Sequence, residues 1–349
     1  MTRQTWTAAI SALLFVVLAA VIALVPVPFI AWAPGSTYDL LGRIDNRDAI
    51  AITGAPTYPS AGELRMTTIS VTAPDSSLSL PEVLISYWMP DRAVLPRVAI
   101  YRPGTSATDV DHQESELMSQ SQTSAVVAAL RATQIDVTEM PMVYSVQTAG
   151  PAAGVLKAGD LISAVDAVPV ATPEDVIEAV KNRHVGQKVV FTLIRDRVPV
   201  QKTVTTRASN ATPDTPVVGI DLSIGYSYEP QVSFAVDPSV GGSSAGLMFA
   251  LAIYDRLTPG ELVAGQVIAG TGTMSADGKI GGIGGVTEKI AAAARDKATV
   301  FLLPKQNCAN VAAVPAGVRL VPVESLSEAI DSLAALADAS TANTVPGCS

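Results

Sequence analysis

The sequence predicts an α+β protein that begins with a membrane-spanning helix and continues into folded domains of mixed helices and strands. Residues 8–25 are apolar and carry no charge. Residues 136–208 combine short strand patterns with turns and one capped helix, and residues 209–340 alternate apolar strands with amphipathic helices. Because 48% of the 349 residues are apolar, the chain can bury real cores and is not disordered overall.

Composition excludes several classes of function. The net charge is −9, from 23 basic and 32 acidic residues, whereas nucleic-acid binders normally carry a basic surface. The chain has only two histidines, His112 and His184, and two cysteines, Cys308 and Cys348. These numbers argue against a zinc site and against a histidine-based metal centre. We therefore expect no metal, no cofactor and no nucleic-acid partner.

The N-terminus predicts the compartment. About 20 apolar residues span a bilayer as a helix, so we expect a transmembrane anchor over residues 8–33. Arg3 is the only charge before the anchor, which favours residues 1–7 in the cytoplasm and an extracytoplasmic segment from residue 34 to 135. The alternative is a cleaved signal peptide, because Ala31–Ala33 has the small-x-small pattern of a cleavage site.

An extracytoplasmic location permits a disulfide between the two cysteines. A Cys308–Cys348 bond would hold the C-terminal tail, residues 341–349, against the last domain. The alternative is a pair of unrelated thiols.

Residues 136–208 form the second region. Thr172 is a helix N-cap and Pro173 occupies the first helical position, which predicts a helix up to Lys181. A hairpin over 189–206 closes the region.

The phrase PAAGVLKAGDLISAVDAVPV within this region resembles a PDZ domain of the bacterial kind. PDZ domains bind extended peptides by strand addition. The resemblance implies a peptide-binding strand over 138–146, with Met142, Val143 and Tyr144 as candidate contacts. A PDZ-like spacer that only packs against its neighbour is the alternative.

Residues 242–246 read GSSAG and fit the nucleophile pattern G-x-S-x-G around Ser244. No histidine follows Ser244, so a hydrolase here needs another base, and lysine is the available one. Lys289 stands in the first turn of an apolar helix, after the glycine-rich run 281–285. Burial and the positive potential of a helix N-terminus both favour a neutral lysine. Alternatively, Ser244 only caps its helix and Lys289 lies on the surface.

Two stretches carry a second resemblance. They read GGSSAGLMFAL and GTGTMSADGKIGGIGGVTEKIAAAARDKATVFLLP, and they resemble the proteolytic domain of Lon proteases. The resemblance implies a catalytic dyad of Ser244 and Lys289, with Thr271 orienting the lysine. It also implies a Lon-type α/β domain over residues 209–340.

In such a mechanism backbone N–H groups stabilise the oxyanion, and the candidates are those of Gly242, Ser243 and Ala245. The residue before the nucleophile is usually proline in the family and is Ser243 here.

Anchor, PDZ and Lon-like regions together resemble membrane-anchored PDZ-domain Lon-like serine peptidases of Gram-positive bacteria. In Lon proteases a strand and a helix precede the catalytic half, and residues 63–71 and 114–131 are candidates for them. The PDZ domain would then be inserted within one Lon-like fold. No G-x-x-x-x-G-K-[ST] loop occurs, so we expect no ATPase module and no use of ATP.

The expected function is an ATP-independent, membrane-anchored serine endopeptidase that cleaves extracytoplasmic proteins or peptides recruited or gated by the PDZ domain. Lon-like domains commonly form rings, so the resemblance also implies a hexamer. Two alternatives stay open at this point. One is a catalytically silent PDZ adaptor on a Lon-like scaffold, and the other is a structural protein of the cell envelope.

Overall fold

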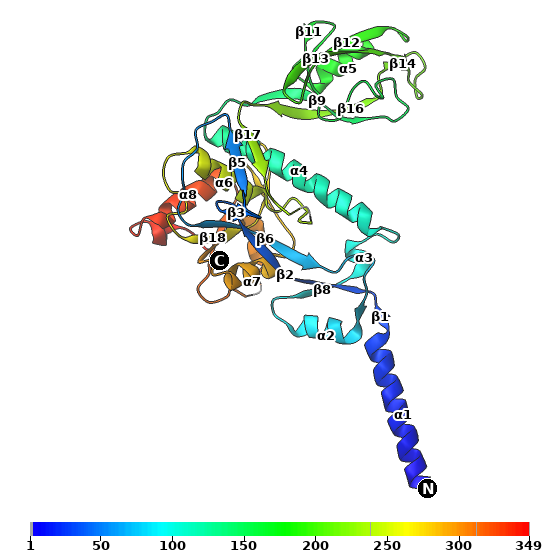
Figure 1. Ribbon diagram of the computed structural model, residues 1–349, viewed down its shortest axis with the longest axis vertical. Coiled ribbons are helices and arrows are strands. Elements are labelled where there is room, and N and C mark those ends of the chain that lie inside the picture. The colour runs from blue at the N-terminus through cyan, green and yellow to red at the C-terminus, as the bar shows by residue number, and fades with distance from the viewer. Residues whose placement is uncertain (1–2, 238, 312, 349) are drawn as a thin grey trace. The chain divides into compact units, whose positions relative to one another are not determined.

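The computed structural model describes residues 3–237, 239–311 and 313–348 and contains two compact units (Figure 1). The first unit comprises Met1–Gln134 and Pro230–Ser349, and the second comprises Ile135–Glu229. The second unit is therefore an insertion in the sequence of the first. Residues 1 and 2 of the expected cytoplasmic N-terminus and residue 349 of the expected tail lie outside the described residues.

The chain begins with helix α1, Arg3–Leu24, drawn in dark blue in Figure 1. It is the one helix in the described residues that is long and apolar enough to cross a membrane, with an 18-residue window of mean hydropathy 2.7. The helix is shorter than the expected anchor over 8–33. Pro26 and Pro28 follow Leu24, and proline cannot continue a helix from its interior.

The residues after Leu24 form strands instead, β1 at Pro26–Val27 and β2 at Phe29–Asp39. The possible cleavage site Ala31–Ala33 lies inside β2. Residues 29–32 of this strand pair with β8, Ala93–Pro96, so a cut after Ala33 would divide a strand of the central sheet.

The first unit is built on one sheet with the strand order β22-β21-β18-β6-β2-β8. Strands β6, β18, β21 and β22 run parallel to one another, whereas β2 is antiparallel to β6 and β8. The bounds are Glu63–Val71 for β6, Val267–Gly270 for β18, Val300–Pro304 for β21 and Arg319–Val323 for β22. Because β6 pairs with β18, the sheet joins residues from both sides of the insertion.

Shorter strands complete the first unit. They are β3 Arg43–Ile44, β4 Arg47–Asp48, β5 Ile50–Thr53, β7 Leu78–Ser79, β17 Gln231–Phe234, β19 Thr273–Met274 and β20 Ile280–Gly281. They pair as β1 with β7, β3 with β4, β5 with β17 and β19 with β20.

The helices of the first unit are α2 Leu80–Trp88, α3 Arg97–Ile100, α4 Ala107–Ala132, α6 Gly246–Leu257, α7 Val286–Arg295 and α8 Leu326–Ala337, with 3-10 turns at Lys305–Asn310 and Ala342–Thr344. Helix α4 starts earlier than the expected 114–131, because Ser106 caps it by accepting a hydrogen bond from the Asp109 N–H.

Residues 246–253 of α6 are all buried. A Cys308–Cys348 disulfide holds the tail, with the two Cα atoms 5.4 Å apart.

The second unit contains a sheet with the order β13-β12-β10-β9-β16, and α5 packs on it. Its elements are β9 Thr138–Val146, β10 Leu161–Val165, β11 Val168–Pro169, α5 Pro173–Lys181, β12 Lys188–Arg195, β13 Val198–Thr205, β14 Arg207–Ala208, β15 Pro216–Val217 and β16 Ile220–Ser227. The unit extends to Glu229 rather than ending at the expected residue 208, because β16 pairs with β9 along its length.

Candidate active site

Ser244 lies in the turn that precedes α6, and two contacts from α4 hold this turn. The N–H of Gly242 donates to the carbonyl of Glu114 at 3.0 Å, and the Ser121 hydroxyl donates to the carbonyl of Ser243 at 3.0 Å. Gly242 has a φ of +89°, a conformation that favours glycine. The glycine before the two serines is thus required by the backbone that presents Ser244.

Lys289 reaches Ser244 from the first turn of α7. The helix starts after Gly285, whose φ of +69° is left-handed, so the glycine run turns sharply into the helix. The side chain of Lys289 is 2% exposed. Its Nζ lies 2.6 Å from Ser244 Oγ and 2.9 Å from Thr271 Oγ1. The three residues selected from the sequence are therefore in direct contact, although 45 residues separate Ser244 from Lys289 in the chain.

Thr271 orients this contact through its own hydrogen bonds. It directly follows β18 and is fully buried. Its hydroxyl donates to the carbonyl of Ser244 at 3.0 Å, so its oxygen is left to accept a hydrogen bond from Lys289 Nζ. A neutral amine that donates to Thr271 keeps its lone pair available for the Ser244 hydroxyl.

Burial sets the protonation of the lysine. Desolvation lowers the pKa of Lys289 to about 7, and the carboxyl of Glu288 opposes this by raising the lysine pKa. Glu288 is itself 3% exposed, and burial raises the pKa of its carboxyl above the usual value. A neutral lysine is therefore accessible near neutral pH, which is the requirement for a lysine base.

A cavity of about 270 Å³ lies at the N-terminal end of α7, and Glu288 and Trp32 are among its lining residues. The indole Nε1 of Trp32 is buried and has no hydrogen-bond partner among the described residues. The Asn307 side chain supports the cavity wall, because it both accepts from and donates to the backbone of Ile283, at 3.0 and 2.9 Å. Neither Glu288 nor Trp32 was indicated by the sequence motifs.

The candidate oxyanion donors differ in availability. The Gly242 N–H already donates to Glu114, so it is not free to receive a developing negative charge. Within the described residues, the N–H groups of Ser243 and Ala245 make no hydrogen bond. Of the three expected donors, these two remain available beside Ser244.

Lys279 provides the contrast. Its side chain is 80% exposed and its Nζ pairs with Asp277 at 2.7 Å, which raises the lysine pKa. An exposed, charge-paired lysine stays protonated and cannot act as a base at neutral pH. No group of three or more His, Cys, Asp or Glu side chains that could hold a metal ion occurs in the part of the chain that the structure describes.

The expected peptide-binding residues of the second unit do not lie at a free edge. Met142, Val143 and Tyr144 belong to β9, which lies between β10 and β16 in the sheet. Met142 is aligned with Leu161 of β10 on one side and with Ser223 of β16 on the other. Met142 and Val143 are therefore paired on both sides and leave no edge there for an added peptide, whereas the pairing with β10 does not extend to Tyr144. The expected peptide contacts of this strand stay a prediction.

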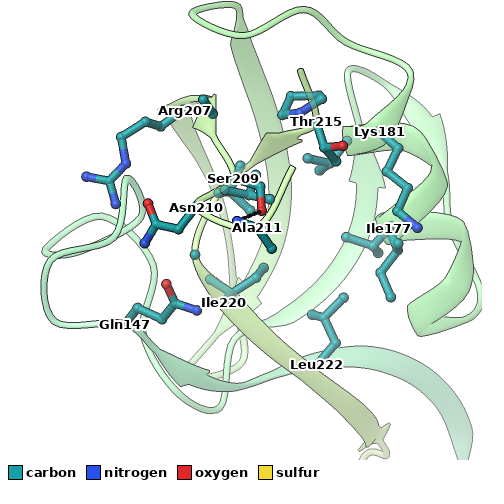
Figure 2. Close-up of a pocket in the computed structure, with 17 residues that line it drawn as sticks. Gln147, Ile177, Lys181, Arg207, Ser209, Asn210, Ala211, Thr215, Ile220 and Leu222 are labelled. Carbon is teal, nitrogen blue, oxygen red and sulfur yellow. Dashed lines mark hydrogen bonds between the residues drawn. The ribbon is translucent and has the colours of Figure 1, made fainter. Parts of the chain in front are cut away.

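The open groove of this unit lies instead between α5 and β16. A cavity of about 360 Å³ is lined by Val176, Ile177 and Val180 of α5 and by Ile220 and Leu222 of β16. Figure 2 shows Ile177, Ile220 and Leu222 around this cavity. The segment before β16, including Arg207, Ser209 and Asn210, also lines it. The signal in the sequence was the alternation of Ile220, Leu222 and Ile224 after Gly219.

Comparisons with known proteins agree with both resemblances. Residues 236–336 match the family described as Lon protease (S16) C-terminal proteolytic domain, and residues 119–206 match the PDZ domain family. A Lon protease of Chloroflexus aggregans is 38% identical over 91 residues, which are 25% of this chain and 11% of that protein. Lon protease 1 of Herpetosiphon aurantiacus is 35% identical over 129 residues, 36% of this chain and 16% of that protein.

Among solved structures, the PDZ domain of an SdrC-like protein from Listeria monocytogenes is 30% identical and matches 24% of this chain and 86% of that chain, with a TM-score of 0.22. The matched part spans only 11 to 16% of the length of the curated Lon relatives. The predicted α+β class is confirmed, with an N-terminal apolar helix, a PDZ domain and a Lon-type proteolytic domain. The proteolytic domain indicates a peptidase.

Proposed function

We propose that this protein is a serine endopeptidase in which Ser244 is the nucleophile and Lys289 is the general base. The observation that carries the proposal is the 2.6 Å contact between Lys289 Nζ and Ser244 Oγ, made by a lysine that is 2% exposed and whose pKa is lowered to about 7. A nucleophile within hydrogen-bond reach of a base that a third group orients is the arrangement that activates a serine.

The reaction begins with neutral Lys289 accepting the proton of the Ser244 hydroxyl while Oγ attacks the carbonyl carbon of the substrate peptide. The carbonyl oxygen becomes an oxyanion, and the N–H groups of Ser243 and Ala245 stabilise it. The lysine then gives its proton to the departing amine, which leaves an acyl-enzyme on Ser244. Thr271 holds the lysine in place through both steps.

Water completes the cycle. Neutral Lys289 accepts a proton from a water molecule that attacks the acyl carbonyl, and the carboxylic acid product departs as Ser244 regains its proton. The sequence contains no phosphate-binding loop, so we propose that this cycle needs no ATP.

The test uses the full chain in lipid nanodiscs with an unfolded protein substrate and no ATP. Cleavage is followed by mass spectrometry for the wild type, Ser244→Ala, Lys289→Met and the control Lys279→Met. We expect the wild type and Lys279→Met to cut alike, and both site variants to lose at least about 10³-fold in rate.

Equal cleavage by Ser244→Ala and the wild type would refute the assignment. Silence of the wild type, together with failure of a serine-reactive phosphonate to label Ser244, would favour the adaptor alternative instead. The contrast between Lys289 and Lys279 separates loss of a base from loss of any positive charge.

We also propose that the groove of the second unit recruits substrate. A peptide would add as a strand along β16, which pairs only with β9 among the described residues, and its side chains would contact Val176, Ile177 and Val180. Ile220→Asp would then weaken capture of unfolded proteins without changing cleavage of a short peptide. The groove of about 360 Å³ would thus serve recognition of the substrate.

The location completes the proposal. We propose that α1 anchors the chain and that the residues after it lie outside the cytoplasm, where the Cys308–Cys348 disulfide is stable. A membrane-impermeant, thiol-specific label tests this after selective reduction of intact cells: it should reach both cysteines.

We further propose assembly into a hexameric ring, for which light scattering of the detergent-solubilised chain is the direct measurement.

A further inference from the structure

Helix α2 presents an apolar stripe to solvent rather than to the protein. Pro81, Leu84, Ile85 and Trp88 follow the spacing i, i+3, i+4, i+7, which places them on one helix face. Leu84 is 41% exposed, Ile85 53% and Trp88 76%, whereas Val83 and Ser86 on another face are buried. In a soluble protein the apolar stripe of a surface helix normally faces the core. Here Leu84, Ile85 and Trp88 of the stripe stay exposed, although α2 also contacts α1, β2 and β8.

The exposed apolar surface continues beyond this stripe. Tyr87 on the same helix is 72% exposed. We define the α2 patch as Leu84, Ile85, Tyr87 and Trp88. Clustered exposed apolar side chains of this kind mark an interaction surface.

The α2 patch lies close to the end of the proposed anchor. Strand β1 follows α1 after one residue and pairs with β7, so that Pro26 is aligned with Ser79 and Val27 with Leu78. Ser79 is the N-cap of α2. The 22 residues of α1 form a helix of roughly 33 Å, which matches a hydrocarbon core of about 30 Å. When α1 spans the bilayer, α2 therefore begins at the depth where the chain leaves the hydrocarbon.

The composition of the patch suits that depth. Trp and Tyr are enriched at membrane interfaces, because their rings are amphipathic, and Leu and Ile favour the acyl region beneath. Glu82 is the only charged residue on α2, and it is directed to the N-cap, where it accepts hydrogen bonds from Ser79. No charge on the stripe opposes contact with lipid.

We propose that the α2 patch inserts into the outer interface of the same bilayer that α1 spans. The inference rests on the proposed membrane anchor. Its occupant is lipid and not a second copy of the chain, because the β1–β7 pairing fixes α2 beside the exit point of α1 in every molecule. The anchor alone would leave the first unit free to tilt on the short β1 connection. Attachment through both α1 and the α2 patch would fix the orientation of the first unit. Helix α2 is followed by β8, an edge strand of the sheet on which this unit is built.

The experiment measures depth in the membrane with nitroxide labels on the full chain in nanodiscs of mixed zwitterionic and anionic lipids. Single cysteines are introduced as Ile85→Cys in the patch, Phe15→Cys in α1 and Ala334→Cys at an exposed position of α8. The relaxation of each label by oxygen, which concentrates in lipid, is compared with relaxation by a water-soluble nickel chelate. We expect the ratio of oxygen to nickel effects at Ile85→Cys to exceed that at Ala334→Cys several-fold, with Phe15→Cys higher still.

Each outcome is decisive. A ratio at Ile85→Cys equal to that at Ala334→Cys, with Phe15→Cys in the core, overturns the docking inference and leaves the anchor standing. A water-like ratio at Phe15→Cys as well removes the anchor and with it the inference. Dipolar coupling between Ile85→Cys labels of two chains, with shielding from both reagents, would assign the patch to a chain–chain interface. A variant carrying Leu84→Ser and Trp88→Ser should return the Ile85→Cys ratio toward the water-like value.

Discussion

The two units differ in how their candidate sites meet water: the site of the first unit is buried, and the groove of the second unit is open. The unit that holds Ser244 joins two stretches of chain separated by the insertion, and its proposed base is packed away from water, with Lys289 2% exposed. The inserted unit is one continuous stretch, and its main feature is an open groove of about 360 Å³ beside an edge strand. Proton transfer by lysine requires desolvation, whereas capture of a peptide requires an unpaired edge.

This difference teaches where a substitution should act. Changes around Lys289 should act on the chemical step and on its pH dependence. Changes in the groove should act on capture of large substrates only.

The largest effect is expected for Lys289→Arg. Arginine keeps the positive charge but cannot lose its proton at accessible pH, so it cannot accept the Ser244 proton. We expect kcat for a short peptide to fall at least about 10³-fold, as for Lys289→Met. Initial rates of peptide cleavage at pH 8, measured over a range of substrate concentrations, give kcat. Substantial activity in Lys289→Arg would mean that charge, and not proton transfer, is the contribution of this position.

Thr271→Val should have the next largest effect. It removes the hydroxyl that accepts from Lys289 and donates to the Ser244 carbonyl, while it keeps the shape of the side chain. We expect kcat to fall about 10²-fold with little change in KM, since one orienting contact is lost. Thr271→Ser restores the hydroxyl and should recover most of the rate. If both variants kept wild-type kcat, Thr271 would have no positioning role.

The pH dependence of activity follows from the lowered pKa of Lys289. With a pKa of about 7, activity should rise through pH 7 and reach a plateau near pH 9, because only the neutral amine is a base. Glu288 raises the lysine pKa, so Glu288→Gln should shift the rising limb to lower pH. Profiles of kcat/KM for both proteins measure the shift. A shift to higher pH, or none, would contradict the proposed electrostatic link.

The stability of the folded state should depend on the same titration of Lys289. Lys289 has a lower pKa in the folded state than its usual 10.5, so the unfolded chain binds more protons between about pH 7 and 10.5. The free energy of unfolding attributable to this group therefore rises with pH across that window, by an amount on the order of 5 kcal/mol. Lys289→Met should be more stable than the wild type below pH 7, and this advantage should shrink toward pH 10 in urea titrations.

The smallest effect is expected in the groove. Ile220→Asp places a charge among Val176, Ile177 and Leu222, all of which line the same cavity. We expect KM for an unfolded protein to rise several-fold while kcat/KM for a short peptide stays unchanged. Tyr144→Asp, at an exposed position on β9 away from the cavity lining, is the matched control. Equal effects of the two changes would show that β16 is not the binding edge.

Local patterns predicted much of this architecture. The apolar run at the N-terminus, the Thr172 cap of α5 and the glycine-rich entry to α7 are local features, and each appears in the structure. The resemblance to Lon proteases implied that Ser244, Lys289 and Thr271 meet, and the three are in contact in the structure. The predicted ends of elements were less accurate. The expected anchor ran to residue 33, whereas α1 ends at Leu24 before Pro26 and Pro28, and residues 29–39 form a strand of the central sheet.

The sequence by its motifs therefore indicated the candidate reacting residues and the kinds of domain, because side-chain chemistry and short-range propensity are carried by neighbouring residues. Only the tertiary structure decided which N–H groups remain available beside Ser244, which strand of the second unit has a free edge, and that α2 turns its apolar face outward. Each of these depends on hydrogen bonds or packing between residues far apart in the chain, such as Gly242 with Glu114 and Pro26 with Ser79. No local pattern encodes such pairings.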